Sequence, residues 1–285
     1  MIRLVLLLVG SLFCLGVGFG FAGAVHPAAD TLSLVRMPLG AVCLLMVLLR
    51  GLGRMRVVLL IAGLAAVVTT VPPWFAGKSG GELTLYNKNL WYRNPELPAL
   101  AADIVASGAE VVTLQEVSRR TNALLDILGQ DYPHQHLCDF NRWAGIAVLS
   151  KHPIADQTCS SRRAAAAVQI IKDDQLVWVV SVHLQWPFPY LNKVTSAAVT
   201  DVLEGLDGPV VVGGDFNIFP WASSVQDIRR ASGTQMAGPL RPSYVLNGSA
   251  LFLDHTYAPG GGEVTYRPLL GSDHNGVLAR LRLEK

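Results

Sequence analysis

Carboxylates, amides and imidazoles recur at the ends of apolar segments in this chain. The segment GGDFNIFPW, residues 213–221, places Asp215 and Asn217 directly after the apolar residues 209–212. In VWVVSVHLQWP, residues 177–187, His183 follows a valine-rich run. The same pattern is seen in four other segments: Asn87 and Asn89 in residues 83–94, Glu116 in 111–117, Asp254 and His255 in 251–257, and Ser272, Asp273 and His274 in 271–277.

This set of side chains suits metal-assisted hydrolysis. The oxygens of Glu116, Asp273 and an Asn amide are ligands for a hard cation such as Mg²⁺ or Mn²⁺. Two histidines and Asp215 are then left to handle a water molecule and an anionic oxygen. The sequence contains no recognisable nucleophile elbow and no glycine-rich phosphate loop leading into a helix. The chemistry indicated is attack of water on a phosphate ester.

Each of these residues also has a purely structural interpretation. Glu116 could cap a helix that starts at Ser118, and His183 could be a satisfied core histidine. Asp215 and Asn217 could form a turn, and residues 272–274 a loop. Taken together, however, these strand ends favour one polar cleft, because the ends of neighbouring strands converge at the same edge of a sheet.

The elements that would position these residues follow from hydrophobic periodicity. The pattern predicts one α/β (or α+β) domain over residues 82–285 with a central sheet assembly, preceded by a short flexible linker at 77–81. The predicted helices are 96–107, 118–129, 191–206 and one near 222–232. The predicted strands are 82–90, 110–115, 144–149, 165–171, 176–184, 209–214, 251–257 and 276–283.

The first quarter of the chain has the composition of a membrane anchor. Residues 1–76 carry only six charged side chains, five of them Arg. The apolar runs 4–25 and 57–76 are long enough to cross a bilayer, and 37–49 is short unless extended back to Thr31. The first run could instead be a cleaved signal peptide, and the second a hairpin or interfacial segment. We favour three transmembrane helices within residues 1–76.

The distribution of arginine predicts the orientation of these helices. The loop RGLGRMR, residues 50–56, holds three arginines and no acid, so it should stay in the cytoplasm. With three spans, Arg3 is also inside and everything after Lys78 is outside. The membrane is therefore an expected partner, the inner membrane of a bacterium the expected location, and the sequence indicates no protein partner.

Charge and cysteine usage narrow the function classes. Residues 77–285 hold 18 Lys and Arg against 20 Asp and Glu, net −2, so the domain lacks the basic excess of most nucleic-acid-binding proteins. The doublets at 119–120, 162–163 and 229–230 are explained as solvated faces. Cys138 and Cys159 could pair in an oxidising compartment, but we expect unpaired, buried cysteines because their spacing demands no disulfide.

The order of these motifs resembles the endonuclease/exonuclease/phosphatase superfamily, the DNase I-like fold. NKNLWYRN, LQEV, LSKHPI, VHL, GGDFN and a terminal SDH follow one another over essentially all of residues 82–283. Three spans before such a domain resemble the membrane-anchored bacterial members. The resemblance implies a sandwich of two β-sheets flanked by helices, with a cleft at one end.

The resemblance also implies roles for individual residues. It makes Glu116 the principal metal ligand, aided by Asn89, or by Asn87 if the register differs by two, and Asp273 a metal ligand or the orienter of a histidine. Asp215 would deprotonate the attacking water and Asn217 would hold the phosphate. His183 and His274 would donate to the phosphoryl oxygens, and Asp254 would steer His183 or His255.

The substrate is left open by the sequence. The implied enzyme hydrolyses a phosphodiester or phosphomonoester of a nucleic acid, a phospholipid or a small molecule. Trp186, Phe188, Tyr190 and Trp221 could stack on bases, meet a lipid surface or simply pack their loops. A catalytically silent binding or scaffold module on the same fold is the alternative to an enzyme.

Overall fold

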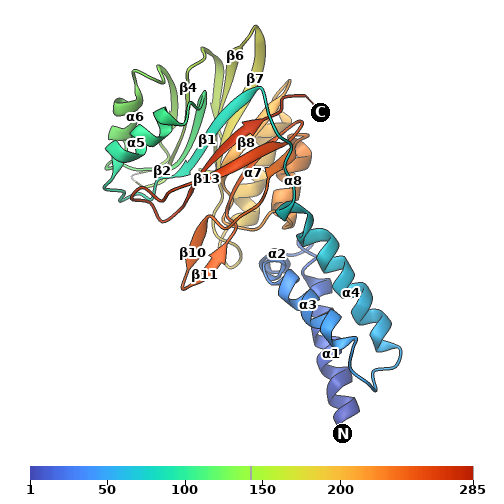
Figure 1. Cartoon of the computed structure of the whole chain (residues 1–285). Helices are drawn as coiled ribbons and strands as arrows, with labels where there is room; N and C mark the ends of the chain where they lie inside the picture. Colours follow the sequence, from blue (N-terminus) through green and yellow to red (C-terminus); the bar gives the residue numbers. More distant parts are fainter. Residues whose placement is uncertain (142, 285) are drawn as a thin grey trace.

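Four helices precede the first strand of the protein (Figure 1). The computed structural model describes residues 1–141 and 143–284. Helices α1 (Ile2–Phe19) and α4 (Met55–Thr70) belong to segments long and apolar enough to cross a membrane. Helices α2 (Pro27–Ser33) and α3 (Arg36–Met46) are bent by 63° relative to each other and qualify as a third span only if taken together. We call α1–α4 the anchor, after the role that the sequence predicts for them.

Small residues let the anchor helices pack closely. A Cβ atom on Gly40 of α3 would collide with the side chain of Ala66 on α4, so the backbones of the two helices approach as only glycine and alanine permit. The opposite surfaces of the anchor are apolar and exposed, for example at Leu8, Leu12 and Leu15. An apolar surface of this kind is stable in lipid rather than in water.

The strands of the domain form one continuous sheet of twelve, in the order β3-β4-β2-β1-β14-β13-β9-β12-β8-β7-β6-β5. The prediction of two separate sheets was wrong, because the unpredicted strand β9 pairs with β13 in parallel and with β12 antiparallel. β9 therefore joins two halves of the sheet, one that runs from β3 to β13 in this order and one that runs from β9 to β5. A separate hairpin is formed by β10 and β11. The strands of the first half are β1 (Leu83–Asn89), β2 (Val111–Val117), β3 (His134–Cys138), β4 (Gly145–Ser150), β13 (Gly262–Arg267) and β14 (Gly276–Leu281). The strands of the second half are β5 (Ile154–Cys159), β6 (Ala165–Lys172), β7 (Gln175–His183), β8 (Val210–Asp215), β9 (Gln235–Gly238) and β12 (Asp254–Ala258). The hairpin consists of β10 (Tyr244–Leu246) and β11 (Ser249–Leu251).

The two halves of the sheet pack face to face over a fully buried aliphatic core. Leu85, Val111 and Val148 from one half pack in one cluster with Val179 and Val211 from the other. Helices α5 (Leu97–Ala106) and α6 (Ala123–Leu128) cover the outer face of the first half, and α7 (Asn192–Glu204) and α8 (Ser223–Ala231) cover that of the second. Burial of apolar surface on both faces explains the continuous apolar runs in the central strands β7 and β8.

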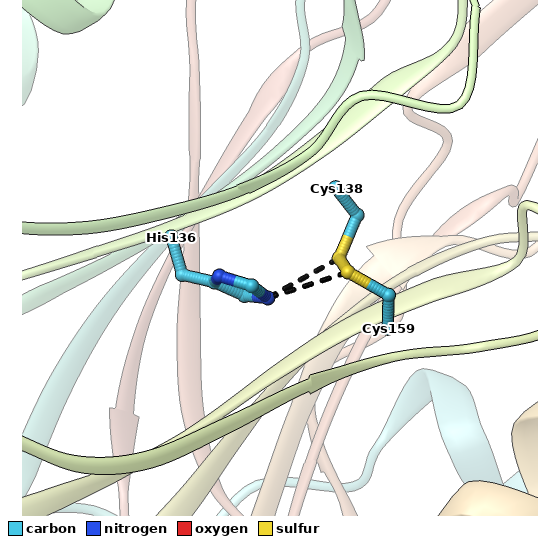
Figure 2. Close-up of side chains that lie close together, drawn as sticks. All are labelled: His136, Cys138 and Cys159. Carbon is cyan, nitrogen blue, oxygen red and sulfur yellow. Dashed lines mark hydrogen bonds between the residues drawn. A yellow bond between two sulfur atoms is a disulfide. The ribbon is translucent and has the colours of Figure 1, made fainter.

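A disulfide joins Cys138 on β3 to Cys159 on β5, which corrects the prediction of unpaired cysteines (Figure 2). Spacing along the sequence gave no sign of it, because the two strands lie at opposite ends of the sheet order and meet only when the halves fold together. His136 Nε2 lies 3.3 Å and 3.4 Å from the two sulfurs. Since both sulfurs are bonded to each other, they present no thiolate to a metal.

The ends of the central strands converge at one edge. β1 and β2 run parallel with Asn89 opposite Gln115, and β7 and β8 run parallel with His183 opposite Asp215. The antiparallel strand β12 begins at the same edge, with Asp254 opposite Asp215. The residues selected from the sequence therefore lie where the two halves of the sheet open.

Candidate active site

A pocket of about 340 Å³ lies at this edge. Strand ends supply its floor, and the loops after β3, β5, β7 and β13 supply its walls. The lining residues include Glu116, Asn141, Arg163, His183, Trp186, Tyr190, Asp215, Asn217, Tyr244, Asp273 and His274.

Glu116 reaches the pocket because its backbone is irregular. The register between β2 and β4 shifts between Leu114 and Val117, and Glu116 has a φ of +55°. A bulge of this kind re-aims one side chain, and a non-glycine residue in the left-handed region is strained, which is common at functional sites. The carboxylate is fixed at Oε2 by the Tyr92 N–H at 3.1 Å and at Oε1 by Asn89 Nδ2 at 3.2 Å.

Asp215 is held by amide donors. Asn89 Nδ2 donates to its Oδ2 at 2.9 Å, and the Asn217 backbone N–H donates to its Oδ1 at 2.9 Å. Asn217 Nδ2 also contacts Oδ2, at 3.1 Å, and donates to the Leu184 carbonyl oxygen at 2.8 Å. Burial, aided by Asp254, raises the pKa of Asp215 to about 6. The carboxylate is thus a stronger base than an exposed aspartate.

The glycines of the GGDFN segment serve strand packing. A Cβ on Gly213 would lie 2.7 Å from Thr113 Oγ1 on the facing half, and one on Gly214 would collide with the Val182 carbonyl oxygen. Both residues are within β8, so they do not form the turn that follows this strand. The turn follows at Asn217, whose φ is +52°.

Asp254 and His274 form a buried pair. His274 Nδ1 donates to Asp254 Oδ2 at 2.7 Å, and the side chains are 5% and 0% exposed. Although burial opposes it, the carboxylates of Asp254 and Asp215 raise the pKa of His274 to about 10. The imidazole is therefore a cation at neutral pH. The expectation that Asp254 steers His183 or His255 was wrong, because its partner is His274.

His183 lies among the same groups without a close bond. Its Nε2 is 3.7 Å from Asp215 Oδ2 and 3.9 Å from Glu116 Oε1. His274 Nε2 is likewise 3.8 Å from Asp215 Oδ2. Two imidazole Nε2 atoms therefore face one carboxylate, which is an arrangement suited to an anionic substrate.

Glu116 and Asp273 are the residues whose properties fit a divalent cation. Burial and the negative charge of Glu116 raise the pKa of Asp273, so the two carboxylates repel each other across the pocket. A cation between them would relieve this repulsion. Asn89 contacts Glu116 through Nδ2, whereas its Oδ1 accepts from the Trp91 N–H at 2.9 Å, so the amide positions the Glu116 carboxylate. Asp215, Asp254 and His274 also offer ligand atoms within 4.8 Å of one another, but His274 Nδ1 is already bonded to Asp254.

Four residues of the predicted set do not line the pocket. Asn89 and Asp254 are buried and bond to the lining residues Asp215 and His274, respectively. Asn87 is buried between the halves of the sheet, where its Oδ1 accepts from Thr113 Oγ1 and Gln115 Nε2. His255 stacks on Phe216 with ring centroids 4.9 Å apart, and its Nε2 contacts the Phe252 carbonyl oxygen at 2.8 Å. Burial lowers the pKa of His255 to about 4. These residues support the site from below and do not face it.

Three further residues of the site escaped sequence analysis. Lys88 is fully buried, and its Nζ donates to the carbonyl oxygens of Pro268, Leu269 and His274, so it ties the His274 loop to β1. A lysine inside an apolar strand is an unusual signal that could have revealed it. Tyr244, whose ring centroid lies 4.6 Å from that of His274, carries no such signal. Arg163 is exposed, as its interpretation as a solvated face predicts, and it also lines the pocket.

The aromatic residues of the loops divide into two groups. Trp186 and Tyr190 line the pocket, and Trp186 also packs edge to face on Tyr244. Trp221 is buried against Phe219 and Phe252, and its Nε1–H donates to the Ser33 carbonyl oxygen of the anchor at 2.7 Å. The IFPW segment therefore joins the domain to the anchor.

Comparison with solved structures finds the same fold in several proteins of low sequence identity. An endonuclease/exonuclease/phosphatase from Bacteroides vulgatus is 14% identical over 69% of this chain and 97% of that chain, with a TM-score of 0.58. Truncated TDP2 from Caenorhabditis elegans is 16% identical over 69% and 96%, with a TM-score of 0.55. The 3′ phosphatase NExo from Neisseria, bound to a product DNA hairpin, is 17% identical over 70% and 98%, with a TM-score of 0.54.

A search of curated proteins found no match. The sequence model of the endonuclease/exonuclease/phosphatase family, however, matches residues 86–274, which is most of the domain and includes every residue of the pocket described above. The chain belongs to the endonuclease/exonuclease/phosphatase family.

Proposed function

We propose that this protein is a membrane-anchored, metal-dependent phosphoric ester hydrolase in which water attacks the phosphorus atom directly. The observation that supports this most strongly is the meeting of Glu116, Asp215 and the Asp254–His274 pair in one pocket. These groups come from four different strands or strand ends, and each is held by hydrogen bonds to defined partners.

The roles follow from geometry and charge. Glu116 and Asp273 would hold Mg²⁺ or Mn²⁺, with Asn89 positioning the Glu116 carboxylate, and the bound ion would supply a Lewis acid that polarises the phosphoryl group. Asp215, with its raised pKa, accepts the proton of the attacking water. The His274 cation and His183 donate to the phosphoryl oxygens, and Asn217 orients Asp215 and the phosphate.

The anchor supports a location on the non-cytoplasmic side of a membrane, such as the periplasmic face of a bacterial inner membrane. The N-terminus and the loop between α3 and α4 lie at the end of the anchor far from the domain (Figure 1). That end carries Arg3, Arg50, Arg54 and Arg56, and the positive-inside rule places it in the cytoplasm. The disulfide on the opposite side is consistent with an oxidising compartment.

The pocket rim favours a substrate at the membrane surface. Thr31 Oγ1 of α2 donates to the Phe188 carbonyl oxygen at 3.2 Å, so the loop that carries Tyr190 rests on the anchor. The Tyr190 side chain is 64% exposed. Val245, in the β10–β11 hairpin, is 63% exposed and is apolar. This hairpin extends toward the anchor end of the domain (Figure 1). Because residues 77–285 have a net charge of −2, we favour a phospholipid or a small phosphate ester over nucleic acid as the substrate.

The experiment is a substrate panel for the full chain in lipid nanodiscs. DNA, RNA, phospholipid and soluble model mono- and diesters are each assayed with Mg²⁺ and with EDTA. We expect hydrolysis that EDTA abolishes and that Glu116→Gln and His274→Gln reduce at least about 100-fold. Glu263→Gln, on the surface strand β13, is the matched control. Activity that survives both site variants would contradict the mechanism, and a folded protein inert on the whole panel would favour a silent module.

A further inference from the structure

A second and larger cavity, of about 680 Å³, lies at the junction of the anchor and the domain. We call it the junction cavity. It is bounded by the ends of α1 and α4, by residues 72–73 and by α8. It shares no lining residue with the active-site pocket, so it is a separate site. Its volume is in the range typical of small-molecule sites.

The charge of the junction cavity is positive. Its charged lining residues are Arg36, Arg229, Arg230 and a single acid, Asp30, which gives a formal net charge of +2. Arg230 is also ion-paired with Asp227, a neighbour on α8 outside the lining, so Arg36 and Arg229 carry the positive charge that this pair does not offset. Asp30 is already engaged, because it accepts from the Ser223 N–H and Oγ–H and from the Ser224 N–H at the start of α8. A cavity of this charge, in a domain with a negative total, is suited to an anion.

Arg36 is the most informative of these residues. It is 4% exposed, and its Nη atoms donate only to backbone carbonyl oxygens, those of Gly20 and Trp221. Its Nε has no partner among the described residues, and its guanidinium lies 4.0 Å from the centroid of the Phe21 ring. A buried cation without a carboxylate within ion-pair distance is costly unless an anion compensates it.

The remaining walls of the junction cavity are apolar. Phe21, Val68, Pro72 and Met236 contribute to them. Since α1 and α4 end at this cavity, it would lie at the depth of lipid phosphates once those helices cross a membrane as proposed above. A ligand that fits must combine an anionic group with an apolar body, and the membrane itself supplies such molecules.

We propose that the junction cavity binds the headgroup of an acidic phospholipid, with its phosphate between Arg36 and the arginines of α8 and its acyl chains along α1 and α4. The shared chemistry is a phosphate anion, and the lipid rather than a soluble phosphate is the occupant because the cavity opens beside the spanning helices. This inference rests on the proposed membrane location of α1 and α4 but not on the proposed catalytic activity.

The test is lipid binding to the full chain in detergent, with EDTA present so that no metal-dependent turnover consumes the ligand. Dimyristoyl phosphatidylglycerol, dimyristoyl phosphatidylcholine and glycerol 3-phosphate are titrated separately, and binding is followed by native mass spectrometry and by melting temperature. The test variant is Arg229→Ala/Arg230→Ala, which alters exposed residues. The control is Arg280→Ala/Arg282→Ala, which removes the same charge from the exposed end of β14.

We expect phosphatidylglycerol to bind at least about tenfold more tightly than phosphatidylcholine and to raise the melting temperature. The test variant should weaken phosphatidylglycerol binding at least about tenfold, as expected for losing charge-assisted hydrogen bonds to phosphate, and the control should not. Equal binding of the two lipids, equal effects of the two double variants, or binding of glycerol 3-phosphate as tight as that of phosphatidylglycerol would each overturn the proposal.

Discussion

Replacing Asp254 with Asn tests whether His274 acts as a cation. The substitution preserves the shape of a side chain that is 0% exposed but removes the charge whose Oδ2 lies 2.7 Å from His274 Nδ1. With Asp254 present, the pKa of His274 is raised to about 10, and the imidazole is almost fully protonated at pH 8. Should the pKa fall to the ordinary value of about 6.5, only ~3% of it would be protonated at pH 8.

Protonation alone then predicts a loss of about 30-fold at pH 8, and the loss of orientation adds to it, so we expect kcat to fall about 100- to 1,000-fold. The assay is the initial rate on a soluble model ester from pH 6 to 10. The parent should hold its rate between about pH 7 and 9 and lose about half of it at pH 6, where Asp215 is half protonated, and at pH 10, where His274 is half neutral. Asp254→Asn should instead lose activity progressively from about pH 7 upward. Asp201→Asn, on the exposed face of α7, is the control. A variant that keeps the parent's kcat and pH profile would refute the role assigned to the pair.

Three further predictions concern stability and the support of the site. Removing the disulfide with Cys138→Ser/Cys159→Ser should cost about 3 kcal/mol, from the separation of 21 residues that it closes, and should make the melting temperature insensitive to dithiothreitol; a variant as stable as the parent would contradict this. Burial lowers the pKa of His255 to about 4, so this residue should destabilise the fold by up to about 3 kcal/mol as the pH falls from about 6.5 toward 4. His255→Phe should flatten that part of the curve of melting temperature against pH. An unchanged curve would argue against a buried, neutral His255. Lys88→Met leaves three carbonyl oxygens without their donor and should lower both the melting temperature and kcat, the latter because the His274 loop loosens; unchanged kinetics would show that the loop is held by other contacts.

The sequence was informative where a residue's role depends on its position along a strand. Two-residue alternation placed Asn87 and Asn89 on one face, and parallel pairing of β1 with β2 and of β7 with β8 brought Asn89, His183 and Asp215 to one edge. The family implied by the motif order is the family that the sequence model identifies.

The sequence was uninformative where a contact arises from the folding of distant segments onto each other. The continuity of the sheet depends on β9, a strand of four residues with no clear pattern. The disulfide depends on the approach of two edge strands, and the partner of Asp254 on the return of a loop from 20 residues away. The alternation of side chains along β1 could not show that Asn87 is buried between the two halves of the sheet whereas Asn89 reaches the site. Which positions of a strand are covered depends on how far the facing half of the sheet extends.

The contact between the anchor and the domain was equally hidden. The Arg229–Arg230 doublet has the pattern of a solvated helix face, and only the position of α8 over the ends of α1 and α4 makes it line a cavity. Arg36 and Asp30 were visible as rare charges in an apolar region, but their partners in the domain lie 185 and 193 residues away in sequence.

The central claim is that Glu116 holds a metal ion on which phosphate ester hydrolysis depends. The most direct measurement is the initial rate of the full chain on its preferred phosphate ester as Mg²⁺ is titrated back after EDTA treatment, for the parent, Glu116→Gln and Glu263→Gln. The account predicts that Glu116→Gln raises the Mg²⁺ concentration for half-maximal rate at least about 10- to 100-fold, since even indirect supports of a metal ligand have effects of this size, while Glu263→Gln leaves it unchanged. A Glu116→Gln enzyme with the parent's Mg²⁺ dependence, or a parent that is fully active in EDTA, would contradict it.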